Sequence, residues 1–270
     1  MAGKLIHEHT LYAEPIFHIG NFVVTNALLT SALAFVVILG ISLAVRRRIR
    51  LVPTGIQNAI ESLIEVFLGV FDDVTGSRRK SLKLAPIVLS FFFFILINNW
   101  MGILPGVGAF GQIVAHGEEH FFIPYLRGGT ADINTTLALG TLGVVLSHIF
   151  GVIAIGWWKY LNKFVNIKAF LEIPGKIMKD PMIILVNPIK AFVSFLEIIS
   201  ELAKVASLSF RLFGNIFAGE VLLASISAIL AWGAPIPFLF LEVLVGFIQA
   251  LIFAMLVLTY VTINTTAEEH

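Results

Sequence analysis

Long apolar stretches, separated by short polar or basic ones, divide the 270-residue chain. About 20 apolar residues in a helix suffice to cross a hydrocarbon core of ~30 Å. The pattern predicts three spanning helices, at 22–45, 84–104 and 134–158, followed by two longer apolar segments at 188–232 and 236–264. We therefore predict an all-α polytopic membrane protein in which residues 1–270 form a single membrane domain.

The segment 53–74 has a different pattern, with an apolar face and an acidic face at helical spacing. It predicts one amphipathic helix that lies at the cytoplasmic membrane interface. An acidic face is not attracted to anionic lipid, so contact with a helix of another protein is favoured.

The segment 188–232 is too long for a simple crossing. It follows Asn187-Pro188, a typical helix start, and has no proline before Pro235. A continuous helix of this length would measure roughly 67 Å, so it must tilt steeply, lie nearly flat within the membrane, or break. Pro235 to Pro237 is expected to turn the chain into the returning helix at 236–264.

Composition supports a membrane protein and gives its orientation. The chain is 58% hydrophobic and 13% charged, against about 25% charged residues in soluble domains. It has no cysteine, which excludes disulfides and thiolate metal sites. Fourteen of its 18 Lys and Arg residues lie in segments assigned inside, whereas only Lys4 and Arg127 lie outside. The positive-inside rule therefore predicts an outer N-terminus and a cytoplasmic C-terminus.

The histidines give weak signals for a metal site. Residues 1–20 contain His7, His9 and His18 at irregular spacing, and we expect a solvated tail there. The string HGEEH at 116–120 lacks the HExxH zinc pattern, so a solvated acidic loop is favoured. His148 lies in the middle of a predicted span. It is either a packed, hydrogen-bonded side chain or a polar side chain that lines a water-filled path.

Arg211 is the most informative residue. A buried arginine costs about 2.5–3.5 kcal/mol on insertion scales and cannot escape the cost by losing its proton. Helical spacing places several polar side chains on one face with it: Glu197, Glu201, Lys204 and Asn215. Small residues flank it on the same pattern and would let a neighbouring helix approach closely: Ala203, Ser207, Gly214 and Ala218.

The polar residues form two separate sets, with Arg211 between them. The inner set comprises Glu197, Ser200, Glu201 and Lys204, and the outer set comprises Asn215, Glu220, Glu242, Gln249 and Asn99. Glu220 and Glu242 can meet across the predicted hairpin. Two polar half-paths separated by a fixed cation suit an ion conductor, because carboxylates can relay protons. The alternative is a buried Arg–Glu network that serves fold specificity.

At this point the chain resembles a known family. SLSFRLFGNIFAGE (207–220) is similar to the signature of the a subunit of rotary F-type ATP synthases. The resemblance also covers the following segments: KLAPIVLSFFFFILINNWMGILP (83–105), ADINTTLALG (131–140), FIQALIFAMLVLTY (247–260) and the terminal AEEH.

The resemblance implies a fold with three roughly perpendicular spanning helices and a hairpin of two long, steeply tilted helices that curve around a ring of c subunits. It implies that the chain is a stator subunit that catalyses nothing alone, needs no cofactor, and contacts peripheral-stalk b subunits in a bacterial plasma membrane. Proton flow through two offset half-channels would drive ring rotation and ATP synthesis.

The resemblance also assigns roles to residues. Arg211 matches the essential arginine that faces the ring carboxylates, and Glu220 matches a position in the outer half-channel. Asn215 and Gln249 match positions near the arginine, and Glu197 and Ser207 match positions linked to the inner half-channel.

Two positions depart from the family pattern. Glu242 stands where some relatives have a histidine, and Gly102 stands where some have an acid. Two carboxylates close together would not normally both be ionised.

Two other classes compete with this reading. An ion-coupled secondary transporter usually shows inverted repeats, and the sequence has no matching halves. An intramembrane enzyme needs a nucleophile or metal set, and none is apparent. No feature suggests a nucleic-acid partner.

Overall fold

The computed structural model describes residues 5–6, 10–47, 49, 52–104, 106–116, 119–164, 183–230 and 233–266. This part of the chain is mostly helical, and five of its helices are long and apolar enough to cross a membrane. They are α1 (Asn26–Arg46), α3 (Arg78–Ile103), α4 (Ile133–Ile155), α8 (Ile183–Ile229) and α9 (Pro235–Thr265). The prediction of a helical, polytopic membrane protein is confirmed at this level.

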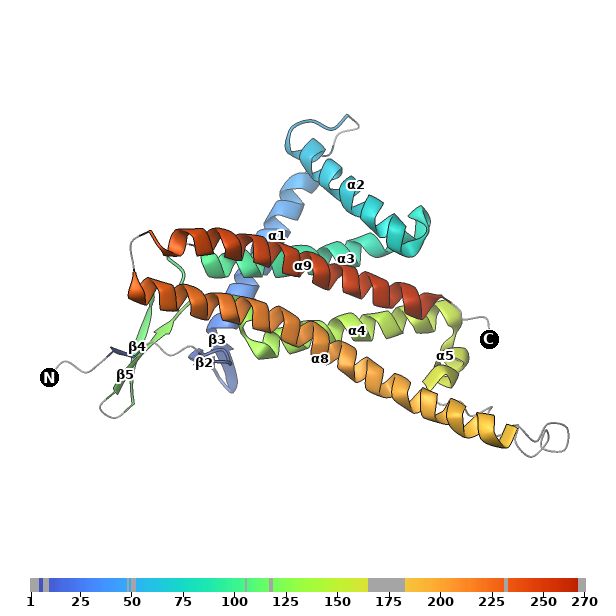
Figure 1. Cartoon of the computed structure of the whole chain (residues 1–270). Helices are drawn as coiled ribbons and strands as arrows, with labels where there is room; N and C mark the ends of the chain where they lie inside the picture. Colours follow the sequence, from blue (N-terminus) through green and yellow to red (C-terminus); the bar gives the residue numbers. More distant parts are fainter. Residues whose placement is uncertain are drawn as a thin grey trace.

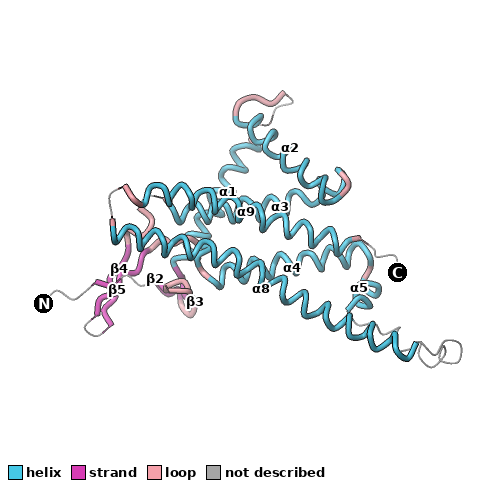
Figure 2. Tube along the Cα trace, in the orientation of Figure 1, coloured by secondary structure: helices cyan, strands magenta, loops and turns pink. Residues whose placement is uncertain are grey.

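Short strands, which the sequence did not predict, accompany the long helices. β1 (Leu5–Ile6), β5 (Glu119–Pro124) and β4 (Gly111–His116) form one small sheet, and β2 (Pro15–Ile19) pairs with β3 (Phe22–Thr25). Aromatic and β-branched residues are frequent in these segments and favour extended backbone that pairs with a neighbour. Figure 2 shows β2, β3, β4 and β5 below the long helices, on the left of the view.

The N-terminal segment is packed rather than a solvated tail from residue 10 onward. The backbone N–H of Ala13 donates to Asp132 Oδ1 at 3.1 Å, and that of Glu14 donates to Asn26 Oδ1 at 3.2 Å. Because β3 occupies residues 22–25, α1 begins at Asn26 instead of Phe22, with Thr25 as its N-cap. His7 and His9 lie outside the described residues.

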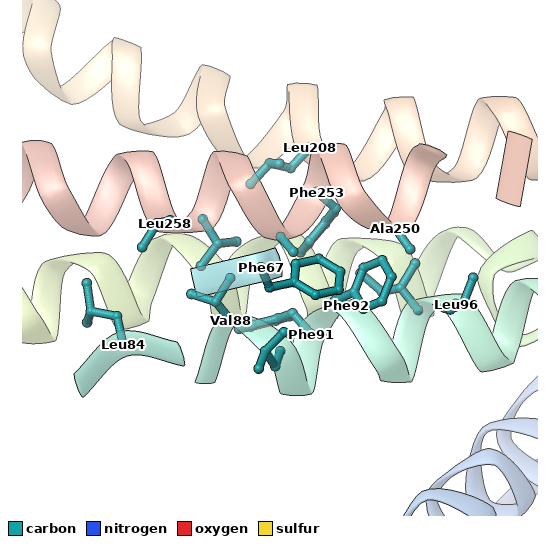
Figure 3. Packing of buried hydrophobic residues seen from close by; sticks show 14 of the residues in the cluster. Phe67, Leu84, Val88, Phe91, Phe92, Leu96, Leu208, Ala250, Phe253 and Leu258 are labelled. Carbon is teal, nitrogen blue, oxygen red and sulfur yellow. The ribbon is translucent and has the colours of Figure 1, made fainter. Parts of the chain in front are cut away.

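The core lies between α3 and α9, and α2 (Ile56–Thr75) and α8 contribute to it. Phe67 of α2 meets Phe92 of α3 with ring centroids 4.7 Å apart, and Phe91 meets Phe253 of α9 at 5.7 Å. Figure 3 shows these rings beside Val88 and Ala250. The apolar face of the predicted amphipathic helix is thus used within the chain, while its acidic residues Glu61 and Glu65 stay exposed.

Large apolar side chains cover the outside of α1, α8 and α9. In water such a surface would be an aggregation hazard, whereas in lipid it is the expected exterior. Examples are Phe35, Val36, Ile41, Phe192, Leu202, Phe240 and Leu244.

The two long helices form the hairpin that the sequence predicts, although their ends differ from those expected. α8 runs unbroken for 47 residues, or roughly 70 Å, and begins before Asn187-Pro188 because a helix tolerates proline near its N-terminus. Gly233, at φ +83°, precedes α9, and Pro235 begins that helix instead of forming the turn. Figure 1 shows α8 and α9 side by side, with α3 along α9 and α4 along α8.

The ends of α3 and α4 also differ from the predicted spans. α3 begins at Arg78, so the basic residues 78–83 are part of the helix. α4 is capped by Asp132, which accepts hydrogen bonds from the backbone of Asn134 and Thr135. It ends at Ile155, and the aromatic residues that follow belong to a separate short helix, α5 (Trp157–Phe164).

Gly140 sets how closely α4 approaches α8. A Cβ at this position would overlap the Ser209 hydroxyl and lie 3.1 Å from the carbonyl oxygen of Val205. A side chain here would therefore push the two helices apart. Gly40, on α1, has nothing within 4 Å of the same virtual atom.

We predict that Gly140→Ala destabilises the protein by about 1–3 kcal/mol through overpacking. Gly40→Ala should be neutral or slightly stabilising, because alanine favours a helix by up to ~1 kcal/mol over glycine. Thermal unfolding of the purified protein in detergent measures both. Equal melting temperatures for the two variants would contradict the close contact.

Candidate functional site

Arg211 lies on an exposed strip of α8. Its Nη2 donates to Ser207 Oγ at 3.2 Å, one turn earlier on the same helix. Within the described chain, no carboxylate forms an ion pair with it. The small residues predicted to flank it are all exposed: Ala203, Ser207, Gly214 and Ala218. The arginine therefore presents an uncompensated charge on a surface that a neighbouring helix can approach.

A cavity of about 200 Å³ brings together three of the five predicted outer residues, and Asn215 and Gln249 do not line it. Its lining includes Asn99 of α3, Glu220 of α8 and Glu242 of α9, together with Glu14 and Arg127. Three helices and the outer loop thus place their polar side chains around one space. The structure brings Glu220 and Glu242 to the same cavity, as the hairpin suggested.

Arg127 is the residue that the sequence reasoning missed. Its side chain is only 4% exposed, and its Nε and Nη2 donate to the Glu220 carboxylate at 3.0–3.2 Å. It also donates to the carbonyl oxygens of Thr10, at 2.8 Å, and Tyr12, at 3.3 Å. Its position in the sequence could have singled it out, since Arg127 is one of only two basic residues in the segments assigned outside.

Glu242 has a different environment from Glu220. The residue is 7% exposed, whereas the Glu220 side chain is 28% exposed. Its carboxylate packs against the backbone of Gly219, where a Cβ would overlap it. The two carboxylates are therefore not equivalent, because one faces a buried guanidinium and the other a glycine backbone.

Three amide side chains join α3, α8 and α9. Asn215 Nδ2 donates to Gln249 Oε1 at 2.7 Å, which joins α8 to α9. Asn99 Nδ2 donates to the carbonyl oxygen of Gly246 at 2.9 Å and accepts from Thr130 Oγ1 at 2.6 Å. These bonds hold polar residues of the predicted outer set in place between the helices.

The inner set surrounds Glu201, which is 8% exposed. Lys204 Nζ donates to Glu201 Oε1 at 2.7 Å. His148 of α4 joins this set, because its Nε2 lies 3.4 Å from Glu201 Oε2 and its Nδ1 lies 2.6 Å from the hydroxyl of Tyr160 in α5. Glu197 is half-buried, and Ser200 and Ser207 are exposed.

Each of the two polar sets contains its own ion pair, and Arg211 takes part in neither. Glu220 pairs with Arg127, and Glu201 pairs with Lys204. Glu201 is ten residues and Glu220 nine residues from Arg211, or about 15 and 14 Å along a helix. The described side chains therefore do not form a buried network around Arg211.

Some predicted features lie outside the described residues. These are Gly117 and Glu118 and the neighbouring side chains of the HGEEH string, the basic residues Lys168, Lys176 and Lys179, and the terminal AEEH.

Comparison with known proteins gives consistent matches along the chain. A family model described as ATP synthase A chain matches residues 28–262. A protein named ATP synthase subunit a from Syntrophobacter fumaroxidans is 32% identical over 255 residues, which cover 93% of this chain and 89% of the relative. Proteins of the same name from Moorella thermoacetica and Campylobacter curvus are both 29% identical, over 91% and 96% of this chain and 93% and 98% of their own lengths.

We predict that Glu220→Gln destabilises the protein by about 2–3 kcal/mol, because it leaves the Arg127 guanidinium buried without its counter-charge. Glu65→Gln is the matched control. It removes an exposed ion pair with Arg78 and should cost less than ~1 kcal/mol. Thermal unfolding in detergent measures both. An equal loss of stability in the two variants would contradict a stabilising role for the ion pair between Arg127 and Glu220.

Proposed function

The chain belongs to the ATP synthase A chain family, and we propose that it is the proton-translocating stator subunit of an F-type ATP synthase. It is a multi-pass membrane protein of the bacterial type. The observation that carries the proposal is the isolation of Arg211. The charge is exposed on a small-residue strip, and Glu220 and Glu201, on either side of it, pair with Arg127 and Lys204 instead.

The proposed partner on the exposed strip is a ring of c subunits that carry carboxylates. Ala203, Gly214 and Ala218 leave room for the ring helices, and Arg211 supplies a positive charge at the contact. At an effective dielectric constant of 20, opposite charges 4 Å apart attract by about 4 kcal/mol, which desolvation partly offsets. Such an attraction orients a deprotonated carboxylate without stalling the ring.

The proposed outer half-channel is the cavity that contains Glu220 and Glu242. Protons enter past Glu220, which Arg127 holds in place, and reach the more buried Glu242. From there they protonate a ring carboxylate near Asn215 and Gln249. The neutral ring site can then move into lipid, and the ring turns.

The proposed inner half-channel follows the other polar set: Glu197, Ser200, Glu201, Lys204 and Ser207. After nearly a full revolution, the ring site meets this set and releases its proton. Arg211 keeps the two paths apart, because its permanent charge repels a proton that would pass directly between them.

The remaining assignments are part of the same proposal. The N-terminus lies outside a bacterial plasma membrane and the C-terminus lies in the cytoplasm. α1, α3 and α4 cross roughly perpendicular to the bilayer, and α8 and α9 tilt steeply along the ring. The exposed acidic face of α2 contacts a peripheral-stalk b subunit. Family membership decides against an ion-coupled secondary transporter.

We predict that Arg211→Ala abolishes ATP-driven proton pumping, because the barrier and the attraction for the ring carboxylate are both lost. Fluorescence quenching in inverted membrane vesicles measures pumping, and co-purification with the ring checks assembly. Arg47→Ala, at the exposed end of α1, should pump normally. Normal coupled pumping by the Arg211 variant would contradict the proposed function.

We predict that the double variant Glu220→Gln, Glu242→Gln loses outer access and conducts protons at least roughly tenfold more slowly, since an amide cannot carry a proton. Glu242→Gln alone should cost more transport than Glu220→Gln, because Glu220 is already paired with Arg127. His18→Gln, on the exposed strand β2, serves as the control. An unchanged transport rate in the double variant would favour a purely structural role.

A further inference from the structure

Four helices bring titratable side chains together at the inner part of α8. His148 of α4 lies between Glu201 of α8 and Tyr160 of α5, and Lys204 is bonded to the same glutamate. Lys204 Nζ also lies 5.3 Å from the ring centroid of Tyr260 in α9. The family resemblance gives no role to His148 or Tyr160.

Glu201 offers one free oxygen to the histidine. Its Oε1 accepts from Lys204, while Oε2 is buried and accepts no hydrogen bond from the described residues. The atom nearest to a bond with it is His148 Nε2, at 3.4 Å. A buried carboxylate oxygen without a donor is costly, so this gap favours a state in which a proton lies between the two groups.

Tyr160 holds the other side of the imidazole. It is 4% exposed, and its ring packs against Gly151, where a Cβ would overlap it. Gly156, at φ +92°, turns the chain from α4 into α5 so that Tyr160 returns to His148. Burial and the negative charges of Glu201 and Glu197 raise the pKa of Tyr160 to about 12, so its hydroxyl keeps its proton and can donate to or accept from Nδ1.

The His148 ring reaches both the cluster and the exterior. Its side chain is 26% exposed, whereas that of Glu201 is 10% exposed. Tyr160 and Glu201 face the imidazole directly. The other titratable groups of the cluster lie one contact further away, since Lys204 bonds to Glu201, Glu197 acts on Tyr160, and Tyr260 lies beside Lys204. An imidazole in this position can exchange protons with water and with a carboxylate that water reaches poorly.

We propose that His148 is a proton-transfer residue of the inner path, connecting Glu201 to water on the inner side of the membrane. The inference rests on the proposed function, since it requires protons to reach Glu201 from the ring. With Nδ1–H donating to the Tyr160 oxygen, the Nε2 lone pair faces Glu201. A proton on Glu201 Oε2 then moves to Nε2, which leaves a carboxylate and an imidazolium. The imidazolium gives a proton to water and returns to the neutral ring.

The test uses the holoenzyme in inverted membrane vesicles, where the inner side faces the medium and its pH can be set. ATP-driven pumping runs the proposed transfer in reverse, from the medium through His148 and Glu201 to the ring. His148→Gln keeps a polar side chain but cannot take a proton. We expect ATP-driven proton pumping to fall roughly tenfold, because positioned acid–base groups contribute ~10²–10⁴-fold and water replaces them in part. The dependence of the pumping rate on medium pH should become flatter in this variant, because it has no imidazole to exchange protons with water.

Two further variants distinguish proton transfer from a structural role. His18→Gln, on the exposed strand β2, should pump like the unmodified protein. Tyr160→Phe keeps the imidazole and removes its hydrogen bond, so pumping should persist with a shifted pH midpoint. This variant also tests the proposal if His148→Gln fails to assemble with the ring.

The outcomes separate this inference from the proposed function. If His148→Gln and Tyr160→Phe lower pumping equally and leave the pH dependence unchanged, the cluster is structural and the inference is wrong. The same holds if His148→Gln pumps normally while Arg211→Ala does not. If Arg211→Ala pumps normally in these vesicles, the proposed function fails instead.

Discussion

A charged group in an apolar environment needs a counter-charge, and this constraint organises the polar part of the structure. Arg127 neutralises Glu220 at one end of α8, and Lys204 neutralises Glu201 nearer the other. Each pair is local, so neither draws on Arg211. The arginine is left as a permanent charge facing outward, which is costly in a lone subunit and useful only where a partner supplies a carboxylate.

The long helix hairpin makes this separation possible. α8 is unbroken over 47 residues, so its polar side chains keep a fixed spacing and cannot collapse onto one another. α3 and α4 hold the hairpin from one side through close packing, as the contacts of Phe91 and Gly140 show. The opposite strip carries small residues and remains open. The hairpin is therefore packed tightly on the side of α3 and α4, and its opposite strip, where we propose that a ring binds, stays uncovered.

The sequence predicted the helices well, because apolar length and helical periodicity depend on local composition. It also identified Arg211, since an arginine in an apolar stretch is conspicuous without any structure. It failed at Arg127 and at the outer strands. Arg127 stands in a loop of ordinary polarity, 93 residues before Glu220, and nothing in its neighbourhood along the chain signals burial. β1 depends on pairing with the distant β5, whereas β2 with β3 and β4 with β5 pair segments that are neighbours along the chain.

The sequence by itself determined the class of protein, the number of long apolar helices and the residues whose charge demands an explanation. These follow from the cost of exposing a backbone or a charge to lipid, which acts on each segment separately. The tertiary structure decided which base neutralises which acid. It assigned Arg127 to Glu220, Lys204 to Glu201 and Tyr160 to His148. Such pairings depend on distances of a few ångströms between separate elements, and only the packing of the helices and the outer loop sets those distances.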